Sequence, residues 1–234
     1  MIVWTDASWA NRKSGGSTGG YIVGLTNEDV LNGSKGHVTV VNWNTNKLKR
    51  VARSSMAAEM QALANAEDEL HLCRLAWYQF NGGPVNLKNI ESTVREVPGT
   101  AIIDAKSIYD VLTSQNQPLQ LAETRTALEL LAYLKNTEQN GTDTRWTHGG
   151  ANLADGLPKT GNHPMLREFL STSEWTLPQG SMSGKKRAAQ GIKKLDSDTH
   201  VNDTEKNTSF SIMAWDKLRE VWPQWCTNSE SESE

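Results

Sequence analysis

The hydrophobic residues of this chain follow two different periods. Short runs that are continuously or alternately apolar predict strands near residues 1–9, 21–25, 37–43, 100–104 and 143–147. Apolar residues spaced three and four apart predict helices over 54–80, 106–113, 123–138 and, more briefly, 165–170. This order of elements predicts an α/β domain.

The lengths of the connections predict how the strands pair. The first three strands are joined by short polar turns, which favours an antiparallel meander. The helix over 54–80 joins the third strand to the fourth, so these two should run parallel with a right-handed crossover. The fourth strand can then pair with the free edge of the first.

The composition changes near residue 180. Beyond it, Ser, Lys, Asp, Asn and Thr dominate and apolar residues become sparse. We therefore predict a folded domain over 1–177 and a low-complexity, disordered tail over 178–234, with a short amphipathic helix at 210–222 as an exception.

Few features of the sequence point to a membrane or to secretion. No secretory signal and no apolar run long enough to cross a bilayer is visible, so we expect no membrane partner. Cys73 and Cys226 form no disulfide framework, which favours a reducing compartment. The expected location is intracellular, either cytoplasmic or nuclear.

The net charge of −3 argues weakly against a general nucleic-acid binder. It does not exclude a nuclease, because bound divalent ions add positive charge at the site itself. One basic cluster stands before the long helix, made of Lys47, Lys49, Arg50 and Arg53. From charge alone, a solvated strand end explains this basic cluster better than a binding patch does.

Four acidic residues interrupt or follow apolar runs: Asp6, Glu59, Asp104 and Asp155. Burying a lone carboxylate costs several kcal/mol unless a partner compensates it. Taken singly, Asp104 and Asp155 can each be explained as a helix cap, and Glu59 as a surface residue that the helix dipole favours. Together they suggest a shared counter-ion, and hard oxygen ligands suit Mg²⁺ or Mn²⁺.

The predicted strand pairing brings these carboxylates together. If the fourth strand pairs with the first, Asp104 lies beside Asp6, and Glu59 reaches the same place from the crossover helix. Two Mg²⁺ ions about 3.5–4 Å apart would neutralise such a cluster and stabilise the attacking and leaving oxygens of a phosphodiester. The chemistry predicted from the residues is hydrolytic phosphoryl transfer.

Several segments carry a resemblance to a known family. Residues 4–10 (WTDASWA), 51–59 (VARSSMAAE), 103–107 (IDAKS), 147–148 (TH) and 152–159 (NLADGLPK) resemble, in this order, the motifs of the ribonuclease H domain of copia-type (LTR) retrotransposon polyproteins. Lys106 stands where many members carry Gln or Asn. The resemblance covers about residues 1–177.

The resemblance implies a ribonuclease H-like fold, an α/β five-stranded mixed sheet with three antiparallel and then two parallel strands, flanked by helices. It implies metal-dependent cleavage of the RNA strand in RNA–DNA hybrids, with Asp6, Glu59, Asp104 and Asp155 as catalytic residues and metal ligands. His148 lies near the place of a mobile catalytic histidine, although a loop histidine is the simpler interpretation. Partners would be the hybrid and a reverse transcriptase or other polyprotein domains.

Nucleic-acid contacts are expected from the basic cluster, from Asn152 and from Trp9, which follows Asp6 on the exposed end of its strand. Two other functions stay open. One is a non-catalytic module that keeps the fold for binding or assembly, although all four acidic residues are present. The other is a DNA nuclease or integrase-type core, because this fold and acidic cluster serve several chemistries.

Overall fold

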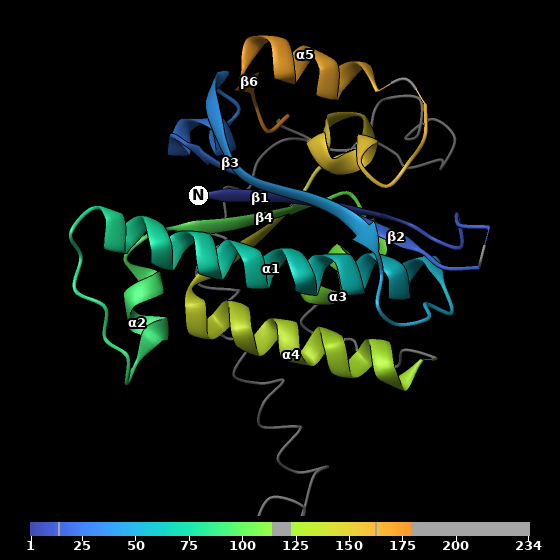
Figure 1. Cartoon of the computed structure of the whole chain (residues 1–234), viewed down its shortest axis with the longest axis horizontal. Helices are drawn as coiled ribbons and strands as arrows, with labels where there is room; N and C mark the ends of the chain where they lie inside the picture. Colours follow the sequence, from blue (N-terminus) through green and yellow to red (C-terminus); the bar gives the residue numbers. More distant parts are fainter. Residues whose placement is uncertain (14, 114–122, 162, 179–234) are drawn as a thin grey trace, which may run out of the picture.

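The computed structural model describes residues 1–13, 15–113, 123–161 and 163–178 (Figure 1). The strands are β1 (Ile2–Ser8), β2 (Thr18–Thr26), β3 (Gly36–Lys47), β4 (Gly99–Ile103), β5 (Thr142–Trp146) and β6 (Glu174–Trp175). The α-helices are α1 (Ser55–Phe80), α2 (Ile90–Arg95), α3 (Lys106–Thr113), α4 (Thr124–Asn140) and α5 (Pro164–Thr172). Three short 3₁₀ helices are η1 (Glu28–Asn32), η2 (Gly149–Ala151) and η3 (Leu153–Gly156).

The strands form one mixed sheet in the order β5-β4-β1-β2-β3-β6. β1, β2 and β3 pair antiparallel, whereas β4 pairs parallel with β1 and β5 parallel with β4. The pairing of the fourth strand with the free edge of the first is therefore confirmed. The α/β arrangement predicted from the sequence is present: three antiparallel strands are followed by two parallel ones, with helices on both faces of the sheet.

The sequence predicted five strands, whereas the sheet has six within the described residues. The additional strand, β6, has two residues and pairs antiparallel with Gly36 and His37 at the start of β3. Two residues are too few to show a period of two in the sequence. The short helix α2 was also not predicted, because it lies in a segment with few apolar residues.

Alternating side chains of β1 explain why the sheet has a core on each face. Val3 packs with α1 and α4 residues such as Leu63, Leu70 and Leu130 in one cluster. Its neighbours Ile2 and Trp4 pack on the opposite face, in the cluster that contains Leu153, Phe169 and Trp175. Figure 1 shows α1 and α4 on one side of the sheet and α5 on the other.

A buried arginine ties α1 to the beginnings of two strands. Arg74 is fully buried and donates to the Val97 carbonyl (2.6 Å), the Thr142 hydroxyl (2.8 Å) and the Asn140 carbonyl (2.8 Å). Gly99 leaves room for it, since a Cβ there would lie 2.7 Å from the guanidinium. These contacts hold β4 and β5 in place at the end of the sheet opposite to Asp104.

The described part of the chain extends to the predicted end of the folded domain. Leu177 is buried and its amide donates to the Val30 carbonyl at 2.9 Å. The predicted short helix at 210–222 lies outside the described residues, and the division at 177 stays a prediction. Among the helices that the structure describes, none is both long and apolar enough to cross a membrane.

Candidate active site

The register of the two central parallel strands places Asp6 level with Asp104. Ile2, Val3 and Trp4 pair with Thr100, Ala101 and Ile102, a constant offset of 98 positions. The same offset brings Asp6, near the end of β1, opposite Asp104, which directly follows β4. Asp6 is 1% exposed and Asp104 is half-buried.

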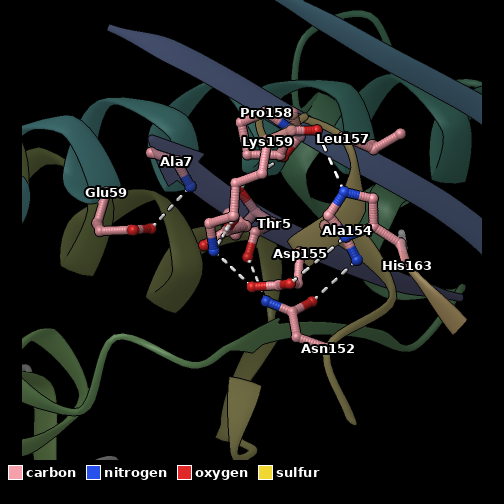
Figure 2. A network of polar contacts seen from close by, with 12 residues as sticks. Thr5, Ala7, Glu59, Asn152, Ala154, Asp155, Leu157, Pro158, Lys159 and His163 are labelled. Carbon is pink, nitrogen blue, oxygen red and sulfur yellow. Dashed lines mark hydrogen bonds and ion pairs between the residues drawn. The ribbon is translucent and has the colours of Figure 1, made fainter. Parts of the chain in front are cut away.

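Helix α1 brings the third carboxylate to the same end of the sheet. The Ser54 hydroxyl caps the helix by accepting from the Ala57 amide at 3.1 Å. Glu59 follows just over one turn later on the buried side, and its Oε2 accepts from the Ala7 amide of β1 at 3.1 Å (Figure 2). Each of Asp6, Glu59 and Asp104 has a carboxylate oxygen within 4.8 Å of one in both of the others.

Burial and mutual repulsion make these carboxyl groups hard to ionise. Burial, followed by the negative charge of Asp104, raises the pKa of Asp6 to about 7. Burial, followed by the charges of Asp6 and Asp104, raises the pKa of Glu59 to about 9. The pKa of Asp104 is also raised, first by burial. The site therefore needs a positive partner before all three groups can be charged near neutral pH.

Asp155 lies beside this triad and is linked to it by a lysine. Asp155 is on η3, and Lys159, one turn later, forms ion pairs with both Asp155 and Asp6. The Lys159 Nζ lies 2.9 Å from Asp6 Oδ2. The charge of Asp155 contributes to the raised pKa of both Asp6 and Asp104. Figure 2 shows Asp155 between Lys159 and Asn152.

Asn152 fastens the Asp155 segment to the central strand. It is 2% exposed, its Nδ2 donates to the Thr5 carbonyl at 2.8 Å, and its Oδ1 accepts from the Ala154 amide at 3.1 Å. Its side chain also partly offsets the raised pKa of Asp104. These contacts give Asn152 a positioning role in the site, and the direct nucleic-acid contact stays a prediction.

The predicted catalytic histidine stands at the edge of the site. His148 is exposed and lies in the two-residue connection between β5 and η2. The neighbouring Gly149 approaches the triad, since a Cβ at this glycine would lie 3.0 Å from Asp104 Oδ2. The loop therefore reaches the acidic cluster, and the catalytic role of His148 stays a prediction.

The basic cluster is divided over the surface near the start of α1. Lys47 and Lys49 line a hollow of about 220 Å³ together with Asp68 and Glu69. Arg50 forms an ion pair with Glu129 of α4. Arg53 borders a second hollow, of about 560 Å³, together with Arg125 and Thr124. Lys47 and Lys49 therefore border a different hollow from Arg53, and Arg50 is paired with an acidic residue.

Trp9 contacts the residue that precedes Arg53. Its indole Nε1 donates to the Ala52 carbonyl at 2.9 Å, and half of the residue is exposed. A ring that is fixed at one edge and open on part of its surface can stack on a base. Stacking by Trp9 stays a prediction.

Sequence reasoning assigned no role to Lys159, although the residue belongs to the last motif. The signal was its spacing of four residues from Asp155, which places both side chains on one side of a helical turn. Its ion pair with Asp6 depends on the path of the η3 segment across the sheet, and the sequence contains no local pattern for that path.

No protein-family model matches the sequence, and no curated protein matches it. Among solved structures, the chain is similar to RNase H1 from the halophilic archaeon Halobacterium salinarum, with 13% identity and a TM-score of 0.43 over 71% of this chain and 97% of that chain. It is also similar to the N-terminal RNase H domain of a Mycobacterium tuberculosis protein, with 15% identity and a TM-score of 0.41 over 73% and 96% of the two chains. At these scores neither likeness bears on the chemistry of the site, which we infer from its own residues.

Proposed function

We propose that this protein is a metal-dependent endoribonuclease that hydrolyses the RNA strand of RNA–DNA hybrids and derives from a copia-type retrotransposon polyprotein. The observation that carries the proposal is the convergence of Asp6, Glu59 and Asp104 at one end of the central strands. The ordered motifs of the sequence support the choice of substrate and the origin.

The acidic residues fit a divalent cation. Asp6 Oδ2 is buried and, within the described residues, has no hydrogen bond of good geometry, although a positive group lies beside it. Carboxylate oxygens suit Mg²⁺ and Mn²⁺, and one or two such ions would be held by Asp6, Glu59 and Asp104, with Asp155 as the fourth ligand. When bound, such ions activate water and stabilise the leaving oxygen of a phosphodiester.

The protein's own residues supply the positioning. Asn152 and the Ala7 amide fix the Asp155 segment and Glu59 relative to β1, so the carboxylates are already arranged before substrate arrives. Trp9 and the basic cluster would contact the hybrid away from the reacting phosphate. Such contacts orient the duplex and give slight sequence preference.

A cleavage assay separates this proposal from the alternatives. Labelled RNA–DNA hybrid, double-stranded RNA and double-stranded DNA are incubated with the protein in Mg²⁺ and in EDTA. We expect Mg²⁺-dependent cleavage of the RNA strand of the hybrid. Cleavage of double-stranded DNA would favour the DNA nuclease or integrase-type core, and the absence of cleavage in any substrate would favour the non-catalytic module.

Two matched variants test the site itself. Asp104→Asn should abolish cleavage with the fold intact, because it removes charge from the metal site. Asp110→Asn, six residues later on α3, is the control, because Asp110 is exposed and pairs with Lys106 at 2.8 Å. If Asp104→Asn keeps the wild-type rate on the hybrid, the assignment of the site is wrong.

A further inference from the structure

Lys159 places a positive charge where the proposed metal ligands meet. Its Nζ lies 2.9 Å from the buried Asp6 Oδ2 and also pairs with Asp155. Burial alone would lower the pKa of Lys159, but its ion pairs with Asp155 and Asp6 outweigh burial and raise the pKa. The ammonium is thus a cation held by two carboxylates that the proposed function assigns to the metal.

The Lys159 ammonium occupies oxygens of Asp6 and Asp155 that a divalent ion would need. A divalent ion held by Asp6 and the Lys159 ammonium would lie within a few ångström of each other, where like charges repel. Without a metal, however, the ammonium relieves the repulsion among the acidic groups. The metal-bound site and the metal-free site, in which Lys159 pairs with Asp6 and Asp155, therefore exclude each other.

The surroundings of Lys159 allow its side chain to leave while the backbone stays fixed. The Pro158 carbonyl accepts from Asn11 Nδ2 at 2.8 Å, and the Leu157 carbonyl accepts from the Thr45 hydroxyl at 3.0 Å. Leu157 also packs on Gly20 of β2, where a Cβ would lie 2.6 Å from the Leu157 Cβ. The Lys159 side chain is 38% exposed, so its flexible stem opens towards solvent.

We propose that Lys159 is a built-in counter-ion that competes with the divalent metal for Asp6 and Asp155, so that metal binding requires its ammonium to leave. The inference rests on the proposed function, because it assumes that the acidic cluster is the metal site. The inference gives Lys159 a role in setting how tightly the site binds the metal.

Metal affinity without nucleic acid tests the competition. Calorimetric titration of the full chain with Mn²⁺ compares the wild type with Lys159→Met, Lys159→Arg and Lys106→Met. Lys159→Met should bind Mn²⁺ roughly tenfold more tightly or better, since one positive charge next to the ligands is removed. Its metal-free melting temperature at pH 7.5 should fall, because the acidic groups lose their counter-ion.

The two other variants are controls. Lys159→Arg keeps the charge and should bind Mn²⁺ within about threefold of the wild type, a difference of less than about 1 kcal/mol. Lys106 forms the same kind of pair with an aspartate four residues later, Asp110, outside the acidic cluster. Lys106→Met should therefore leave the affinity unchanged. Equal or weaker Mn²⁺ binding by Lys159→Met would overturn the proposal.

A second measurement tests the proposal even if Lys159→Met does not fold. In the wild type, an amine-reactive reagent followed by mass spectrometry reports how accessible each lysine is. Saturating Mn²⁺ should speed labelling of Lys159 several-fold and leave Lys106 unchanged, and equal labelling of Lys159 with and without Mn²⁺ would refute the competition. Asp104→Asn separates the two hypotheses: if Mn²⁺ binds as well to this variant as to the wild type, the metal site itself is wrong and the role of Lys159 falls with it.

Discussion

Replacing Glu59 with Gln tests whether the acidic cluster is strained in the metal-free protein. Glutamine keeps the shape of the side chain and its acceptor for the Ala7 amide, but it carries no charge. Because the pKa of Glu59 is raised, the native protein binds this proton more tightly than the unfolded chain does. The contribution of Glu59 to stability is therefore fully present below pH 4.5 and is lost as the pH rises towards about 9.

The size of the effect follows from these two values. Each pH unit between them costs about 1.4 kcal/mol of stability. At pH 7, about 2.5 units above the ordinary pKa of 4.5, the wild type has lost roughly 3 kcal/mol that Glu59→Gln retains. We expect the variant to be more stable by up to about this amount at pH 7, with the difference vanishing near pH 4.

Urea denaturation in EDTA at pH 4, 5.5, 7 and 8 measures this difference. Glu91→Gln is the control, because Glu91 is exposed on α2, a helix that contributes no residue to the acidic cluster. Saturating Mg²⁺ should reverse the order of stability, since the wild type gains binding energy that the variant partly lacks. If Glu59→Gln is no more stable than the wild type in EDTA, or if its gain in stability does not change with pH, the proposed repulsion among Asp6, Glu59 and Asp104 is refuted.

Three further predictions concern other parts of the chain. Changing the whole basic cluster to Gln should flatten the salt dependence of hybrid affinity, measured with Ca²⁺ in place of Mg²⁺. The slope should fall by about 0.7–0.9 log units for each phosphate that the variant no longer neutralises. Parallel salt slopes for the variant and the wild type would point to another docking face. Truncation after Gly180 should leave the melting temperature and the cleavage rate nearly unchanged, whereas a large drop in either would move the domain boundary. Arg74→Met should lower the free energy of unfolding by roughly 3 kcal/mol or more in urea denaturation, because buried carbonyls lose their donor. A decrease below about 1 kcal/mol would contradict the role of Arg74 in holding α1, β4 and β5 together.

The sequence by itself determined the main elements and their order. A continuous apolar run marks β1, because both faces of this strand are buried. Apolar residues at helical spacing mark α1, because burial of one face of a helix imposes that period locally. The short connections and the single long crossover then leave few ways to pair the strands. The neighbourhood of Asp6 and Asp104 follows from that pairing, and Glu59 joins them because it lies on the buried side of α1.

Only the tertiary structure decided the features that depend on loops and on distant packing. The two-residue strand β6 exists because Trp175 packs edge-on against Trp4, with ring centroids 4.9 Å apart, and no local period marks it. The members of the basic cluster lie within seven consecutive residues, yet Arg50 forms an ion pair with Glu129 of α4. The position of the Lys159 ammonium depends on how the segment after η3 crosses the sheet, and contacts from Asn11, Gly20 and Thr45 fix that path. Periodicity records which face of an element is buried, but long-range contacts between side chains and irregular backbone leave no repeating pattern in the sequence.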